Sequence, residues 1–92
     1  MALTATVTKK SVSLVQEKLY NVTFNLILTD TTEVFNKDYS IKYRTGQNIS
    51  TLTNKFIKLM QDDIDKYKAE QVIFNATQLN TAVNNVNSGL NL

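Results

Sequence analysis

Three aspartates near the middle of the chain, Asp62, Asp63 and Asp65, form the densest group of side chains that could bind a metal ion. A calcium loop needs spaced oxygen ligands, a glycine at its tight turn and a distal glutamate, and no such series follows these aspartates. On a helix, Asp62 and Asp65 share a face while Asp63 points elsewhere. We therefore interpret the group as a solvated acidic patch and predict no metal site.

Two residue types on which many enzyme sites depend, cysteine and histidine, are missing from the 92 residues. Without them there is no disulfide, no thiolate zinc site and no histidine base for a nucleophilic serine. The two isolated glycines cannot build a phosphate-binding loop. We predict that the protein is not an enzyme and has no cofactor and no small-molecule substrate.

Basic and aromatic side chains alternate in the middle of the chain and could bind a nucleic acid, because tyrosines stack on bases and cations hold phosphates. This candidate site consists of Lys37, Tyr39, Lys42, Tyr43, Arg44, Lys55 and Lys58. A formal net charge of +2 is small for a nucleic-acid-binding domain. Tyr39 and Tyr43 also fit the core face of a strand with the lysines in solvent. Nucleic acid is therefore an alternative partner and not the favoured one.

The distribution of charge along the chain is its most informative feature. The ten Lys or Arg and eight Asp or Glu residues all lie between Lys9 and Glu70, and none lies from Gln71 to Leu92. A solvated surface helix usually carries charges. The tail is therefore expected either to cover the sheet of its own domain or to form an interface in an oligomer. The candidate interface residues are Leu79, Asn80, Val83, Asn84, Val86, Asn87 and Leu90.

The elements that position these residues differ between the two halves of the chain. Over residues 3–44, apolar and polar residues alternate, most clearly over residues 20–28, which predicts a half-buried strand. The alternation slips by one position at Lys9–Lys10, which indicates a bulge or a short turn. A hairpin loop is expected at Asp30–Thr32. The sequence thus predicts an antiparallel meander of three strands, or of four if the early run splits.

The spacing of apolar residues changes to three or four after Gly46, one of only two glycines, where we expect a left-handed turn conformation. This spacing predicts a first helix over residues 48–70 that begins near Asn48 or Ser50. The helix would position the three aspartates and part of the basic set.

A second helix is predicted over residues 75–89, with Asn75 at its N-cap and Gln78 at its third position. A single helix through both segments would be about 60 Å long, too long to pack on so small a sheet. The alternative is a short extended piece at Gln71–Phe74 between the helices. The fold class is therefore α+β, with residues 1–92 forming one domain.

Other classes of protein are excluded by the lack of long apolar runs. A membrane-spanning helix needs roughly 20 apolar residues, and no run approaches this length. The start of the chain, residues 1–6, has no charged region followed by an apolar stretch, so we expect no signal peptide. These features predict an intracellular protein that does not associate with a membrane.

The order of segments resembles small proteins encoded in the structural-gene regions of tailed phages and prophages. The segments that carry the resemblance are Met1–Thr4, Tyr20–Leu26, Tyr39–Gly46, Met60–Glu70 and Leu79–Leu92. The resemblance implies a virion or assembly component, located in the host cytoplasm or in the virion, and it implies no catalytic residue.

We therefore expect a non-enzymatic structural protein that self-associates into a homo-oligomer or docks on other assembly proteins. One alternative is a small nucleic-acid-binding protein that uses residues 37–58. Another is a regulator that binds a host protein through the edge of its sheet.

Overall fold

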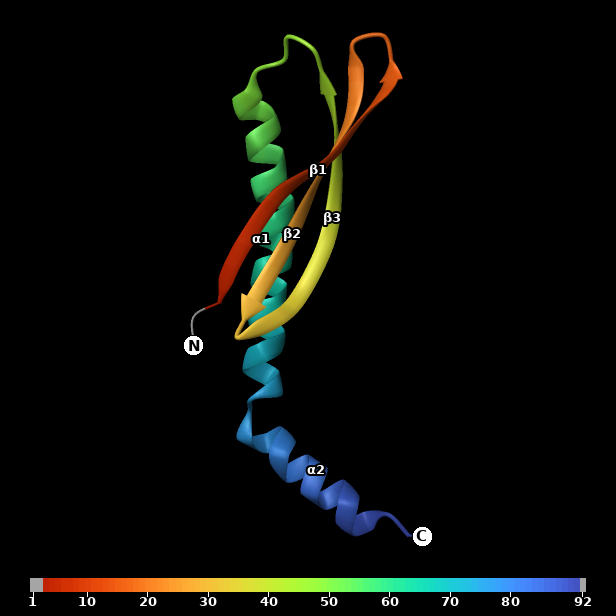
Figure 1. Ribbon diagram of the computed structural model, residues 1–92. Helices are drawn as coiled ribbons and strands as arrows, with labels where there is room; N and C mark the ends of the chain where they lie inside the picture. The colour runs from red at the N-terminus through yellow and green to blue at the C-terminus, as the bar shows by residue number, and fades with distance from the viewer. Residues whose placement is uncertain (1–2, 92) are drawn as a thin grey trace. The chain divides into compact units, whose positions relative to one another are not determined.

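The computed structural model describes residues 3–91 and has the predicted α+β class, with three strands followed by two helices (Figure 1). The elements are β1 (Thr4–Gln16), β2 (Leu19–Asp30), β3 (Thr32–Arg44), α1 (Ile49–Phe74) and α2 (Thr77–Gly89). The chain divides into two compact units, with the boundary inside α1 between Met60 and Gln61. The first unit contains the sheet and the start of α1. The second contains the rest of α1 and α2.

The three strands form an antiparallel meander in which β2 lies between β1 and β3. The early run does not split, because the slip in its alternation is a β-bulge. Lys9 pairs with Phe24 and Ser11 pairs with Thr23, which leaves Lys10 as the extra residue. The predicted hairpin loop is confirmed at Thr31, which takes a left-handed φ of 70° between β2 and β3.

The core of the first unit lies between one face of the sheet and the start of α1. The phenyl rings of Phe24 and Phe56 stack there, with centroids 4.1 Å apart and ring planes 15° apart. Residues at intervals of four along α1 form the stripe that faces the sheet. The buried side chains are Val22, Leu26, Leu28, Tyr39, Leu52, Phe56 and Met60.

The opposite face of the sheet is polar and is held by side-chain hydrogen bonds between neighbouring strands. The hydroxyl groups of Thr23 and Ser40 lie 2.7 Å apart, and Asn25 Nδ2 donates to Asp38 Oδ1 at 2.9 Å. Lys10, the bulged residue, reaches from β1 to form an ion pair with Asp38 on β3. Hydrogen bonds from Lys10 and then Asn25 lower the pKa of the Asp38 carboxyl.

The turn from the sheet to α1 matches the prediction. Gly46 takes a φ of +92°, a conformation that side chains disfavour. The backbone N–H of Ser50 donates to Asn48 Oδ1 at 2.9 Å, so Asn48 caps the first turn of α1. The helix extends past the predicted residue 70, to Phe74.

Two helices follow the sheet, as predicted, with the break between them at Asn75 and Ala76. The alternative of an extended piece at Gln71–Phe74 is wrong, because these residues are helical. The predicted N-cap is also wrong. Ala76 holds that position without a side-chain bond, and Asn75 Nδ2 instead donates to the Gln71 carbonyl oxygen at 2.9 Å. The Asn75 side chain therefore closes the end of α1, whose last carbonyl groups have no partners within the helix.

Neither helix within residues 3–91 has an apolar stretch long and uncharged enough to cross a lipid bilayer.

Candidate interaction surface

The most prominent surface feature of the second unit is the apolar stripe of α2. Leu79, Val83 and Val86 recur at helical spacing, Leu90 follows as the C-cap residue, and the four are 41%, 58%, 58% and 63% exposed. No residue of α2 is buried. The stripe is therefore formed as the sequence predicts, and in this structure it faces water.

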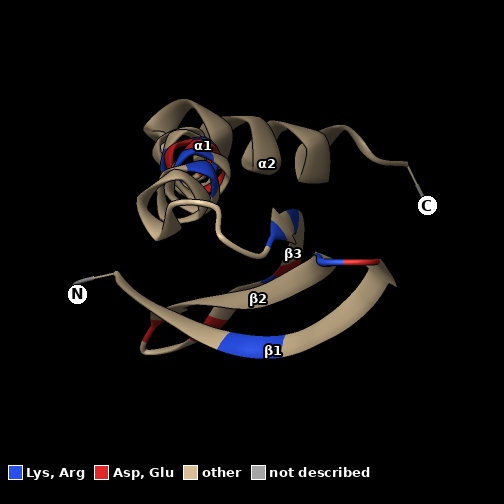
Figure 2. Ribbon diagram, turned by 90° about the horizontal axis from the view of Figure 1, so that it is seen from above, with Lys and Arg blue, Asp and Glu red and all other residues tan. Residues whose placement is uncertain are grey.

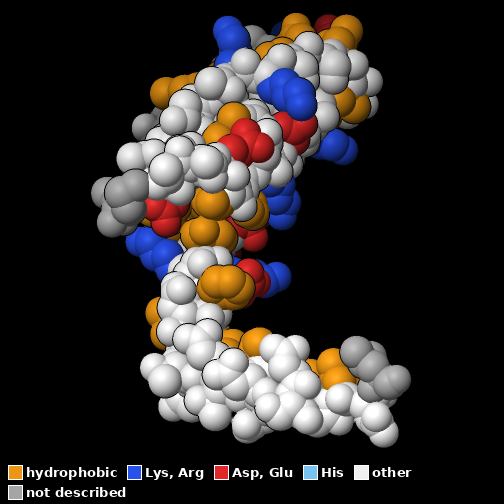
Figure 3. Space-filling model, turned by 60° about the horizontal axis from the view of Figure 1, so that its bottom comes forward, with side chains coloured by type: hydrophobic (Ala, Val, Ile, Leu, Met, Phe, Trp, Pro, Cys, Tyr) orange, Lys and Arg blue, Asp and Glu red, His pale blue; other side chains and the backbone are white. Residues whose placement is uncertain are grey.

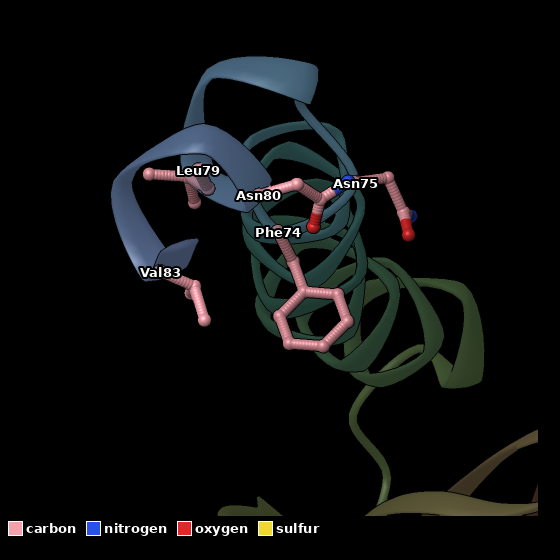
Figure 4. A pocket seen from close by; sticks show the side chains of 5 residues that line it. All are labelled: Phe74, Asn75, Leu79, Asn80 and Val83. Atoms are coloured by element: carbon pink, nitrogen blue, oxygen red, sulfur yellow. The ribbon is translucent and has the colours of Figure 1, made fainter. Parts of the chain in front are cut away.

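The last turn of α1 extends this apolar surface. Val72, Ile73 and Phe74 are all exposed, Phe74 to 70%. A pocket of about 300 Å³ lies at the break between the helices. Figure 4 shows the side chains that line it, which are Phe74, Asn75, Leu79, Asn80 and Val83. The phenyl ring comes from α1 and the aliphatic side chains come from α2. Such a pocket suits an apolar side chain of a partner protein.

A stripe of amides runs beside the apolar stripe of α2. At 100° per residue, Asn80, Asn84 and Asn87 fall on the neighbouring strip of the helix surface. Each amide can both donate and accept a hydrogen bond. The helix carries no ionisable side chain, and its ribbon shows neither blue nor red in Figure 2. An interface on α2 would therefore use apolar contact and amide hydrogen bonds, with no ion pair.

A second apolar surface lies on β1, and the sequence did not point to it. Every residue of β1 is exposed. The register places Val7, Val12 and Leu14 on the same face as the core residues of β2, yet they are 50%, 54% and 65% exposed. Strands lie about 4.8 Å apart and a helix is about 10 Å wide, so one helix over β2 and β3 leaves β1 uncovered. Figure 3 shows hydrophobic side chains scattered over the face of the molecule seen in that view.

The proposed nucleic-acid residues do not form one surface within the sheet. Tyr39 is buried in the core, and Lys37 Nζ lies 5.1 Å from the centre of its ring. The register places Tyr43 on the core face, while Lys42 and Arg44 alternate with the core residues and so lie on the polar face. The remaining members, Lys55 and Lys58, are exposed on α1.

The three aspartates of α1 form no metal site in the described part of the chain. No three acidic side chains in residues 3–91 come close enough together to hold an ion. Asp62 and Asp65 are exposed and Asp63 is half-buried. Asp65 Oδ1 accepts a hydrogen bond from Gln61 Nε2 at 2.9 Å, one helical turn away.

Comparisons with protein-family models, with curated proteins and with solved structures give no match for this chain. No relative therefore supplies a substrate, a partner or a site residue. A function can be argued from two features, the apolar stripe of α2 and the apolar row of β1, which consists of Val7, Val12 and Leu14.

Proposed function

We propose that this chain is a non-enzymatic structural or assembly protein of a phage or prophage particle, which acts by self-association or by docking on a larger assembly. The observation that carries the proposal is the apolar stripe of α2, with Leu79, Val83, Val86 and Leu90 all exposed. Contiguous exposed apolar surface in a soluble chain is characteristic of a protein–protein contact.

The chemistry of the tail supports contact with protein over contact with nucleic acid. The residues from Gln71 to Leu92 carry no charge, so they offer no cation to a phosphate backbone. The absence of charged residues is also what distinguishes the centre of an interface from ordinary surface. The phage assignment rests on the resemblance of the sequence segments.

The mass of the protein in solution tests the proposal. The wild-type chain is expected to associate as its concentration rises, when followed by sedimentation or by light scattering after size-exclusion chromatography. Val83→Asn places an amide in the middle of the stripe and is expected to shift association to at least tenfold higher concentration, which corresponds to a loss of about 1.4 kcal/mol of binding free energy.

Ser88→Asn is the matched control, because it introduces the same side chain on the opposite side of the same helix. It is expected to leave association unchanged. A wild-type chain that stays monomeric at high concentration would count against self-association. Equal effects of the two substitutions would show that the stripe is not the contact.

A further inference from the structure

Two apolar surfaces of the chain are exposed, the row on β1 and the stripe on α2. Val12 and Leu14 lie on the core side of the sheet but are more than half exposed. The apolar stripe of α2 is exposed as well.

Val12 and Leu14 lie at one end of the row. They pair with Val22 and Tyr20, toward the start of β2. That end of the sheet is where β3 ends and α1 begins, since Leu19 pairs with Arg44. Val12 and Leu14 thus lie at the end of the sheet where α1 begins.

We propose that α2 of one copy docks on the core-side face of β1 in a second copy. This inference rests on the proposed self-association and names the surface that the stripe contacts. Each copy supplies one helix and one uncovered row, so each takes part in two such contacts. The row and the stripe are apolar on both sides, and their burial removes the exposed valines and leucines from water.

The polar groups at the two surfaces are also compatible. Lys9 is the one charged residue in the row, between Val7 and Val12. The amide oxygens of Asn80, Asn84 and Asn87 lie beside the apolar stripe and can accept hydrogen bonds from its ammonium group. The helix brings no cation that would repel Lys9, because it has no charged side chain.

The size of the contact fits a modest association. A helix of thirteen residues is about 20 Å long and about 10 Å wide, and so covers about 200 Å² in projection. Two contacts in a reciprocal dimer, counted on both partners, cover about 800 Å² of flat area. Interlocking side chains bury more than the flat projection, which brings the total toward the lower limit of stable interfaces, about 1,200 Å².

Pairing of two β1 edges is the rival arrangement, and the bulge argues against it. A bulge that carries lysines is a common way to protect an edge strand from a second sheet. Lys9 and Lys10 lie at this bulge, and the register of β1 shifts again between Leu14 and Gln16. The edge is therefore irregular at two points, while the row of side chains on the face remains continuous.

The absence of cysteine makes cross-linking a direct test. A Val12→Cys chain, made heavier by a tag, is mixed with a Val83→Cys chain and treated with a short bismaleimide, because elements packed face to face lie about 10 Å apart. The heterodimeric product is expected. Ser13→Cys in place of Val12→Cys is the control, since Ser13 pairs with Asn21 on the polar face, and the product is expected to be lost.

Three results would overturn the inference. These are equal yields with Val12→Cys and Ser13→Cys, a product formed only between two Val83→Cys chains, and an intramolecular product in the Val12→Cys/Val83→Cys double variant. If the wild-type mass shows an oligomer while one of these results holds, the proposed function stands and the docking site fails. If the wild-type chain is monomeric throughout, both fail.

Discussion

The start of α1 and the whole of α2 have similar amphipathic patterns, but the apolar face of α1 is buried there and that of α2 is exposed. Leu52, Phe56 and Met60 are at most 6% exposed, because the sheet supplies a facing surface. Leu79 and Val83 repeat the same spacing and remain exposed. Periodicity in the sequence therefore specifies an apolar face of a helix but not the surface that covers it.

Two phenylalanines offer the strongest test of this contrast. Phe56 is 3% exposed and stacks on Phe24, whereas Phe74 is 70% exposed. Phe56→Ala is expected to lower the free energy of unfolding by about 3–5 kcal/mol, because it leaves a cavity in the core. Phe74→Ala, the matched substitution, is expected to change it by no more than about 0.5 kcal/mol in the monomer.

Denaturant unfolding at a concentration where the chain is monomeric measures both values. The same two variants should behave differently in an association assay, where Phe74→Ala weakens the contact by opening the pocket beside Leu79. Comparable losses of stability for the two variants would show that the second unit has a core of its own, and the contrast would then fail.

Much of the fold follows from local patterns in the sequence. The alternation over residues 20–28 predicted β2 because the strand is central and has one buried face. The phase slip at Lys9–Lys10 located the bulge, because one extra residue must reverse the alternation. Gly46 located the left-handed turn. Each of these signals depends only on neighbouring residues.

The role of Asn75 shows why a helix end is harder to predict. An N-cap asparagine accepts a hydrogen bond from the following helix, whereas Asn75 donates one to the preceding helix. The side-chain amide can do either. The break was predicted correctly because the sequence contains signals for both helices. Those signals do not distinguish an Asn75 amide that caps α2 from one that donates a hydrogen bond to the end of α1.

The candidate surfaces differ in how far the sequence could predict them. The α2 stripe was predicted from spacing and from the lack of charge. The row of Val7, Val12 and Leu14 could not be found in this way, because its alternation is that of any half-buried strand. Its exposure follows from the strand order and from the width of one helix, which are tertiary properties.

The ion pair between Lys10 and Asp38 on the polar face of the sheet gives a smaller effect, which depends on pH. The hydrogen bond from Lys10 lowers the pKa of Asp38, so the folded state favours the ionised carboxyl. The resulting stability is present above the ordinary aspartate pKa of about 3.9 and is lost as the pH falls through the lowered value. Lys10→Met is expected to raise the pKa of Asp38, as followed by NMR titration of its carboxyl.

Lys42→Met is the matched control, because it removes another lysine from the polar face and should leave the titration of Asp38 unchanged. An unchanged pKa in Lys10→Met would show that the ion pair does not form in solution. Association through α2 should not change over this acid range in either variant while the sheet stays folded, since the helix has no titratable side chain.

Hydrogen exchange as a function of protein concentration tests the central claim most directly, that α2 is covered only by another copy. Peptides from β2 and from the start of α1 should be equally protected at all concentrations, because their core lies within the chain. Protection of peptides from α2 should rise as the protein associates. Protection of α2 that is already complete at monomeric concentrations, and unchanged on association, would contradict the account.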